Sequence, residues 1–581
     1  MHLLLFDTAG IQPYIFRSNR LRENLGASHL VAQATGPWVV EAVRALDARA
    51  ILPAHPDRHL EHDDDALLEV VYTAGGNALV LARSAAVAEA LVRRLSTRLL
   101  TDAPGLRLIA STCPFDFRTH ALAETVGTLI RDLARQKRED APSEPLLGLA
   151  VTRACRATGH PAVGQTRPWG TEAPTFVSAE VLAKLNAVQA ANRALAETFA
   201  PGERLGRALA YPTELDALGR SHGDTSLLAV VHADGDGMGA RFRQLGREYA
   251  EADQNRAYIA AFRALSRRVD TVARAALDST LDALRARIHS HPKDPTRLVI
   301  EHRNEANDLI QRIELVRSGA EHYLPVRPIV SGGDDLTLVC DGRLGLSLTT
   351  HYLTAFAEAA RAHGLDGVTA SAGVALVKSR YPFARAYHLA EQLARSAKDY
   401  RRALGEDAAV GCLDWHLSRT TLYDDARAMR AREYQTPYGL LTLRPLALDA
   451  HGDVPPARTW PTVAAGISGF QGAAWHARRN KTLRLREALR EGPAVVKQVM
   501  AGLNAAAPAR QRGSAVELPA LPGGVAPADQ SGWTSDKPSR ALYFDALELA
   551  DLHVPLGPAA TPGASPDASL SDDLPAHAAL A

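Results

Sequence analysis

The chain has 581 residues, and at about 150 residues per domain this length predicts three or four folding units. Hydrophobic residues make up 46% and charged residues 23%, which excludes a chain that is disordered throughout. The net charge is +1, so the molecule as a whole has no field that attracts nucleic acid or an anionic membrane. Any such contact must come from a local patch.

The four cysteines are scattered and form no CxxC pair: Cys113, Cys155, Cys340 and Cys412. This spacing disfavours both a disulfide framework and a zinc ribbon, and it favours a reducing compartment. The first residues lack the basic lead and the long apolar run of a signal peptide, and no stretch is apolar over about 18 residues. We therefore expect a cytoplasmic protein without membrane contact.

The first block of the chain alternates strand and helix signals in the order β-α-β-β-α-β. We expect a strand at 2–6, a helical region at 18–46, strands at 67–72 and 78–81, a helix at 84–100 and a strand at 106–111. The two central strands flank a Gly-Gly-Asn turn, which is typical of a hairpin. This order predicts a ferredoxin-like arrangement.

The same order returns after residue 226. We expect strands at 226–233, 326–330, 336–340 and 368–377, with helices at about 250–289, 346–363 and 382–402. The second hairpin also has Gly-Gly at its turn. We therefore predict an α+β fold with two ferredoxin-like (βαββαβ) domains, helical insertions and a helical C-terminal region.

These signals divide the chain into five segments. The two βαββαβ domains are predicted at 1–115 and 221–405, with a helical linker at 116–220 between them. A helical C-terminal domain is predicted at 406–504. The segment 505–581 is rich in Pro, Gly and Ala, and from about residue 555 it has so few residues to bury that we expect a disordered tail.

Two acidic groups meet in the predicted topology of the second domain. The apolar strand 227–231 leads to Asp234 and Asp236. The first strand of a βαββαβ fold lies beside the central hairpin, which carries Asp334 and Asp335. These carboxylates would then face one another across one or two strand spacings of about 4.8 Å.

Clustered carboxylates repel one another, so their coexistence predicts a bound divalent cation. Mg²⁺ or Mn²⁺ fits best, because oxygen-ligated metals of this kind clamp the reacting oxygens in phosphoryl transfer. Gly332 and Gly333 would let a triphosphate approach the backbone closely. The pattern thus predicts nucleotidyl transfer, whereas a Gly-Gly-Asp-Asp turn without this context is only a polar hairpin.

Several of these motifs together resemble a known family. The second domain is similar to the second palm domain of the large subunit of type III CRISPR effector complexes, the Cas-ten family, and the first domain resembles that family's first palm. The residues that carry the resemblance are Ser331-Gly332-Gly333-Asp334-Asp335 with the preceding 324–330, Asp234-Gly235-Asp236, Ala372-Gly373-Val374-Ala375, Tyr381-Pro382, and in the first domain 10–16 and 24–28.

The resemblance implies a palm polymerase that joins ATP into cyclic oligoadenylate, a second messenger in antiviral defence. It implies catalytic roles for Asp234, Asp334 and Asp335, with Asp236 as a further metal ligand, and contact between Lys398 and the triphosphate. The implied partners are ATP, other CRISPR effector subunits and, through them, RNA; dimerisation stays open.

The chain also departs from the family pattern. It starts directly at the first palm, so the family's HD nuclease activity is not expected. The zinc-binding insert is reduced to Cys155 and a nearby His160, so we expect no zinc. The first palm has Asn77 where the second has an acid, so we expect it to be inactive; the role of Asp7, at the end of the first strand, stays open.

Two further features stay open at this stage. A basic patch at Arg478, Arg479, Lys481, Arg484 and Arg486 could contact RNA or could be a solvated helix face. The rivals of cyclic oligoadenylate synthesis are a GGDEF-like cyclase that makes a cyclic dinucleotide from GTP and a non-catalytic scaffold subunit of an RNA-guided complex.

Overall fold

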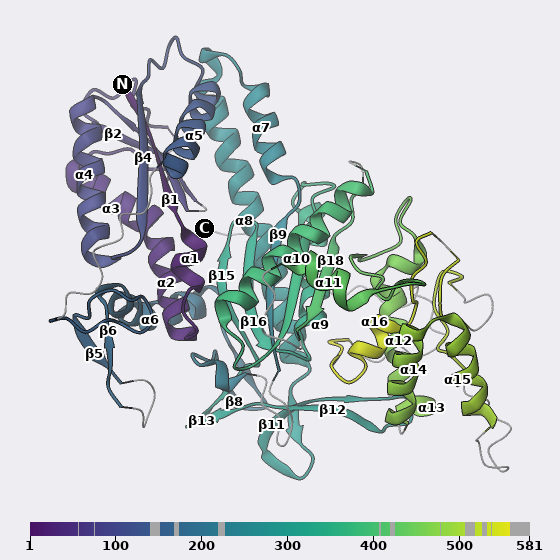
Figure 1. The fold of residues 1–581 in the computed structure, drawn as a ribbon. Coiled ribbons are helices and arrows are strands. Elements are labelled where there is room, and N and C mark those ends of the chain that lie inside the picture. The colour runs from purple at the N-terminus through teal and green to yellow at the C-terminus, as the bar shows by residue number, and fades with distance from the viewer. Residues whose placement is uncertain are drawn as a thin grey trace.

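The protein is described by a computed structural model (Figure 1). The structure describes residues 1–55, 57–74, 76–139, 151–167, 173–218, 227–405, 408–418, 425–476, 478–505, 517–525, 531–535 and 537–557. Most of the predicted tail, 555–581, lies outside the described residues, as does Gly75 of the first hairpin.

The first sheet has four antiparallel strands in the order β2-β3-β1-β4. They are β1 (His2–Ala9), β2 (Leu68–Ala74), β3 (Asn77–Ala82) and β4 (Arg107–Pro114), and the helices are α1 (Ile11–Phe16), α2 (Leu21–Thr35), α3 (Pro37–Leu46) and α4 (Ala85–Asp102). The predicted ferredoxin-like order is confirmed. The predicted helical region at 18–46 is two helices rather than one, because Pro37 has no N–H to continue α2 and instead starts α3; α1 lies ahead of this region.

The second sheet repeats this arrangement and extends it. Its strands lie in the order β15-β16-β9-β17-β18-β21, where β17 and β18 are parallel. They are β9 (Leu227–Gly235), β15 (Val326–Gly332), β16 (Asp335–Asp341), β17 (Ala370–Lys378), β18 (Cys412–Leu417) and β21 (Leu446–Ala447). The helices are α7 (Met238–Glu248), α8 (Asn255–Ala286), α9 (Gly345–Ala362) and α10 (Phe383–Ala403). The predicted placement of the first strand beside the hairpin is confirmed by the pairing of β9 with β16.

Small strands occupy the connections, where the sequence predicted helix or nothing. Between α8 and β15 lie β10 (His289–His291), β11 (Asp294–Arg303), β12 (Leu309–Glu314), β13 (Arg317–Ser318) and β14 (Glu321–Tyr323). The linker contains α5 (Leu122–Glu139), α6 (Ala179–Thr198), η1 (Leu215–Ala217) and the strands β5 (Gly164–Thr166), β6 (Thr175–Val177), β7 (Glu203–Arg204) and β8 (Arg207–Ala210). β14 pairs in parallel with β8 of the linker. Because β14 comes directly before β15 in the chain, this pairing connects the linker with the first part of the second sheet's hairpin.

The C-terminal region is helical, as predicted, and packs beside the second sheet on the side away from the first (Figure 1). It comprises α11 (Ala426–Tyr434), β19 (Gln435–Thr436), β20 (Gly439–Leu440), α12 (Trp460–Gln471), α13 (Ala473–His476), α14 (Arg479–Glu491), α15 (Pro493–Ala505) and α16 (Phe544–Leu549). Short 3₁₀ turns lie at η2 (Ala252–Gln254), before α8, and at η3 (Pro456–Arg458), before α12.

Part of the segment predicted as a Pro/Gly/Ala-rich extension belongs to the core. The side chains of α16 are almost fully buried, and Phe544 and Leu549 have no exposed surface. Arg444, also fully buried, forms ion pairs with Asp545 (3.3 Å) and Glu548 (2.9 Å) on α16. The exact boundaries of the five predicted segments stay predictions.

One apolar core cluster lies under the second sheet, and another joins the two sheets. The joining cluster includes Leu4 and Phe6 of β1, Leu228 and Val230 of β9, and Tyr387 of α10, whose ring stacks on Phe16 at a centroid distance of 3.7 Å. The two sheets are therefore neighbours through buried side chains. Across the described ranges, no helix is both long and apolar enough to cross a membrane.

Candidate active site

Three carboxylates gather where β9 ends and β16 begins. The apolar residues of β9 are buried up to Ala233, which is opposite Leu336 of β16. The next residues in this antiparallel register are Asp234 and Asp335, so the two strands place their carboxylates side by side. The register therefore places Asp234 and Asp335 opposite each other, one strand spacing apart, within the range predicted for the acidic groups.

The third carboxylate, on Asp334, reaches the same place because residue 235 has no side chain. A Cβ added at Gly235 would lie 2.8 Å from the Cβ of Asp334, which is closer than real contacts allow. Gly333 has φ +61° and makes the turn, a conformation that L-residues rarely adopt. No heavy atom lies within 4 Å of a Cβ built at Gly332 or Gly333, so the space beside these glycines is open, as their predicted role requires.

Burial and mutual repulsion shape the charge of this cluster. Burial raises the pKa of Asp334 and of Asp335 above the ordinary range for a carboxyl, and the neighbouring charge of Asp234 raises it further. Asp335 receives an additional contribution from Asp334. Such a group of carboxylates binds protons or cations more strongly than isolated ones do.

Lys398 of α10 supplies a positive charge to the cluster. Its ammonium donates to the carboxylate of Asp234 and to the carbonyl oxygen of Gly235, the latter at 3.0 Å. The sequence predicted Lys398 near the triphosphate. The structure brings it to the same site but engages it with Asp234, so contact with a triphosphate stays a prediction.

Asp236 is held differently from the other three acids. Asp236 is buried, with 6% of its surface exposed. Its carboxylate accepts hydrogen bonds from the hydroxyls of Thr369 (2.8 Å) and Ser371 (2.9 and 3.0 Å). Burial raises its pKa. Asp236 thus fixes the end of β9 against β17, and its assignment as a metal ligand stays a prediction that this geometry does not favour.

A cavity of about 400 Å³ opens beside these acids. Asp234, Asp236 and Asp334 line it on one side, and its basic lining residues are Arg243, Lys398, Arg401 and Arg402. Sequence reasoning did not identify the three arginines. The spacing of Arg401 and Arg402, three and four residues after Lys398 on one helix, is the signal that could have found the last two.

The carboxylates fit a divalent cation by their chemistry. Asp234, Asp334 and Asp335 supply only oxygen donors, which suits Mg²⁺ or Mn²⁺, and burial together with the charge of Asp234 raises the pKa values of Asp334 and Asp335. Within the described part of the chain, no group of three or more His, Cys, Asp or Glu side chains has a ready-made metal-binding arrangement.

The corresponding position of the first sheet is built otherwise. Asp7 of β1 is opposite Asn77 of β3, and its carboxylate forms an ion pair with Lys137 of α5 at 2.6 Å. This pairing gives Asp7 a counter-charge, and the residue opposite it on β3, Asn77, is an amide rather than an acid. In the linker, the N–H of Cys155 donates to the carbonyl of His160 at 2.8 Å; the expected lack of zinc and the inactivity of the first palm stay predictions.

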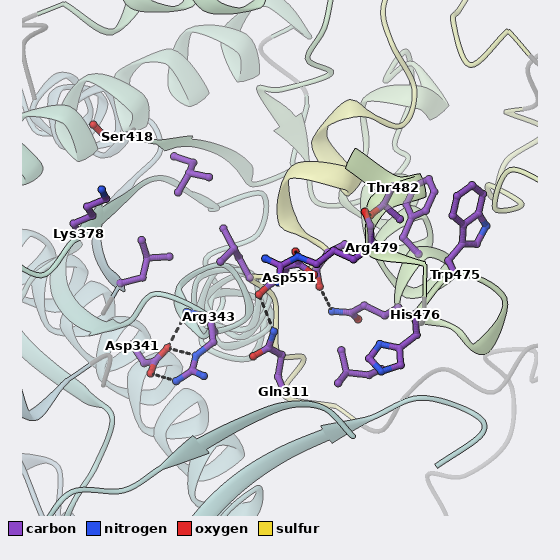
Figure 2. Close-up of a pocket in the computed structure, with 17 residues that line it drawn as sticks. Gln311, Asp341, Arg343, Lys378, Ser418, Trp475, His476, Arg479, Thr482 and Asp551 are labelled. Atoms are coloured by element: carbon purple, nitrogen blue, oxygen red, sulfur yellow. Dashed lines mark hydrogen bonds and ion pairs between the residues drawn. The ribbon is translucent and has the colours of Figure 1, made fainter. Parts of the chain in front are cut away.

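A second cavity, of about 550 Å³, lies at the other end of the second sheet (Figure 2). It is lined by the start of β9 at Leu227, by Lys378 at the end of β17, and by Arg479 of the predicted basic patch. Arg479 forms an ion pair with Asp551 at 3.4 Å, and Arg343 forms one with Asp341 at 2.7 Å. The patch thus borders a cavity far along β9 from the carboxylates, and RNA contact there stays a prediction.

The fold and this acidic hairpin together define a palm-type βαββαβ domain. Residues 227–404 match the family described as Cas10/Cmr2, second palm domain. The resemblance found in the sequence is confirmed for this segment.

The chain also matches solved structures of Csm1, alone or in a Csm1–Csm4 cassette, at low sequence identity. Csm1 in T. onnurineus is 14% identical over 95% of this chain and 70% of that chain, with a TM-score of 0.49. A Csm1–Csm4 cassette in complex with pppApApA is 14% identical over 95% and 69%, with a TM-score of 0.48, and one in complex with cA4 is 15% identical over 95% and 70%, with a TM-score of 0.45. No curated protein was found that matches this chain.

Proposed function

We propose that this protein is a metal-dependent nucleotidyltransferase that joins ATP into a cyclic oligoadenylate messenger in CRISPR-type antiviral defence. One observation carries the proposal. The Asp234, Asp334 and Asp335 carboxylates converge beside a cavity that Lys398 and Arg401 also line, within a segment that matches the Cas10/Cmr2 second palm. The carboxylates suit a divalent cation, and the neighbouring positively charged side chains suit a triphosphate.

Each residue has a defined part in the proposed reaction. Asp234, Asp334 and Asp335 would hold one or two Mg²⁺ or Mn²⁺ ions. A divalent cation supplies charge for triphosphate oxygens and lowers the pKa of an attacking ribose hydroxyl. Gly332 and Gly333 leave open space for phosphate.

The basic residues act on the other side of the cavity. Lys398 and Arg401 offer positive charge where the leaving pyrophosphate gains negative charge, which lowers the energy of the transition state. Asp236 acts as a positioning residue, because its bonds to Thr369 and Ser371 fix the strand end that carries Asp234.

We also propose that the protein works with other CRISPR effector subunits and that RNA controls it through them. The support is the family of the 227–404 segment together with the net charge of +1. A protein that bound a guide duplex alone would be expected to carry a broad positive surface.

The test is to incubate the purified protein with each labelled nucleoside triphosphate and with Mg²⁺ or Mn²⁺, in the presence and absence of RNA. Cyclic oligoadenylate as the product supports the proposal. A cyclic dinucleotide made from GTP would instead assign the protein to the GGDEF-like class, and a lack of product with every nucleotide, also in the presence of effector subunits, would favour the scaffold.

A further inference from the structure

Arg327 of β15 is a buried cation without an acidic partner. Its residue is 2% exposed, and one guanidinium nitrogen donates to the side-chain oxygen of Asn192 at 2.7 Å. The guanidinium carbon also lies 5.7 Å from the centre of the Tyr211 ring. Its Nε has no hydrogen-bond partner, and among the described residues no carboxylate forms an ion pair with it.

This arrangement is costly for a residue that serves only packing. Burying a charge without a counter-charge costs several kcal/mol, which is comparable to the whole free energy of unfolding of a domain. Burial lowers the pKa of Arg327 to about 10, so the side chain stays charged at neutral pH. An apolar residue of similar volume would be more stable here, and this points to a ligand that supplies the missing negative charge.

A cavity of about 240 Å³ lies directly beside Arg327. Its polar lining residues are Ser28, His29, Thr198, Arg274, Arg327 and Ser331, and among the described residues no acidic side chain lines it. The remaining lining is apolar and comes mainly from α2 and α6. The cavity is separate from the carboxylate cavity, with which it shares no lining residue.

We propose that this cavity binds a small phosphate-bearing anion, whose oxygens pair with the guanidinium of Arg327. Arginine is the side chain best suited to this role, because its planar donors match phosphate oxygens two at a time. Ser28 offers a hydroxyl donor. The hydroxyl of Thr198 donates to the carbonyl oxygen of Ala194 at 2.9 Å, and Arg274 forms an ion pair with Asp270 at 2.8 Å, so Arg327 is the lining arginine without an acidic partner among the described residues. This inference does not depend on the proposed nucleotidyl transfer.

The position of the cavity gives the anion a structural consequence. Its walls come from α2 of the first βαββαβ unit, α6 of the linker and β15 of the second sheet. The same β15 ends at Gly332, next to the acidic hairpin. A bound anion would therefore connect three parts of the chain that meet at the strand leading to Asp334 and Asp335.

The experiment measures the Tm of the full chain against inorganic phosphate and against AMP, at constant ionic strength with chloride as the replaced salt. The measurements use the Lys398→Gln, Arg401→Gln background, so that phosphate at the carboxylate cavity does not contribute. We expect a Tm that rises with ligand concentration, as binding to the folded state requires. A response to phosphate alone identifies free phosphate as the ligand, and a stronger response to AMP identifies a nucleotide.

Three further substitutions locate the binding. Arg327→Met should weaken binding by at least about tenfold, which corresponds to about 1.4 kcal/mol, and should leave the ligand-free Tm unchanged or higher. Ala194→Leu, which adds apolar volume to the lining of the cavity and leaves Arg327 in place, should also abolish the response. Arg268→Gln, on the exposed face of α8 outside the cavity, serves as the matched control and should bind like the parent.

Two results would overturn the inference. One is the absence of any Tm response to both ligands in the parent protein. The other is an unchanged response in Ala194→Leu and in Arg327→Met, or in Ala194→Leu alone where the Arg327 variant does not fold. A fall in the ligand-free Tm of a folded Arg327→Met variant with binding retained would mean that Arg327 only supports packing.

Discussion

Lys398 and Asp234 are joined by an ion pair although 164 residues separate them in the chain. The ammonium of Lys398 also donates to the carbonyl oxygen of Gly235, at 3.0 Å. The ion pair links α10 to the end of β9. It places the ammonium of Lys398 against the cluster of carboxylates in the site.

Lys398→Met should therefore lower both activity and apo stability. Removal of the ammonium leaves Asp234, Asp334 and Asp335 without their nearest counter-charge, so repulsion among them increases. We expect product formation to fall by about a hundredfold, the size typical for one lost electrostatic contact to a transition state. The Tm in EDTA should fall, and Mg²⁺ should restore much of it. An unaltered Tm in EDTA would show that the ion pair contributes nothing.

The double variant Asp334→Ala, Asp335→Ala should abolish product formation and leave the Tm unchanged or higher. Both effects follow from the same cause: the substitution removes cation ligands and also relieves repulsion between buried carboxylates. Asp366→Asn is the matched control, since Asp366 is an exposed acid in a loop between α9 and β17. Undiminished turnover in the double variant would refute the active-site assignment.

The stability of the cation-free protein should depend on pH in a defined direction. Asp334 and Asp335 bind protons more tightly in the folded state than in the unfolded chain, because burial and the charge of Asp234 raise their pKa values. Their contribution to stability is therefore greatest at low pH and is lost as the pH rises from about 4, the value in the unfolded chain, through the raised folded pKa values.

The measurement is the Tm in EDTA between about pH 5 and pH 8, a window that spans the raised folded pKa values, for the parent and for Asp334→Asn, Asp335→Asn. The Tm of the parent should fall relative to that of the variant as the pH rises, and saturating Mg²⁺ should remove the difference. Comparison with the variant cancels groups of opposite sign, such as His553, whose pKa burial lowers to about 3. Parallel curves for the two proteins would contradict this prediction.

The two palm-like units should differ in their sensitivity to substitution. Asn77→Ala removes a side chain that faces Asp7, which already has Lys137 as its counter-charge. Asp234→Ala removes a carboxylate from the crowded site of the second unit. We expect Asn77→Ala to keep most of the turnover and Asp234→Ala to lose at least about a hundredfold, as measured by product formed from labelled ATP. A larger loss at Asn77 would place the active half in the first unit.

Arg401→Gln tests a residue that the sequence alone did not single out. Arg401 lines the carboxylate cavity and its Nε has no hydrogen-bond partner. If it contacts the triphosphate, kcat/KM for ATP should fall by about ten- to a hundredfold, equal to about 1.4–2.8 kcal/mol of lost transition-state stabilisation. Arg402→Gln is the natural comparison, because Arg402 is exposed and pairs with Asp399 at 2.6 Å; equal losses in both would mean that only general positive charge matters.

The parts of the fold that could be predicted are those set by local pattern. A continuous apolar run identified β9, mostly apolar stretches identified β16 and β17, and the Gly-Gly turns identified both hairpins, so the strand order followed from general topology. That order predicted that Asp234 or Asp236 would face Asp334 and Asp335, and the register of β9 and β16 places Asp234 beside Asp335. The break at Pro37 is also encoded locally, since proline has no N–H to continue a helix.

The parts that were missed depend on distant contacts. The strands β10, β13 and β14 have only two or three residues each, and β11 and β12 are flanked and interrupted by polar residues, so none of them has the long run of apolar residues that predicts a strand. The direction of Asp236 is set by Thr369 and Ser371, which lie 133 and 135 residues away along the chain. In the same way, nothing in the order of residues shows that Arg327 is buried or that an acid is missing near it.

The buried contacts of Arg444 with Asp545 and Glu548 define where this chain can be shortened. A chain ending before residue 545 would keep the arginine in the interior and discard both of its acidic partners, and the loss of one side of a buried ion pair costs about 3–5 kcal/mol. A C-terminal end point chosen from composition alone would fall before residue 545, since the segment 505–581 as a whole is rich in Pro, Gly and Ala. Truncation after residue 557 removes neither partner, so a ladder of shortened chains should lose soluble yield abruptly between these two end points.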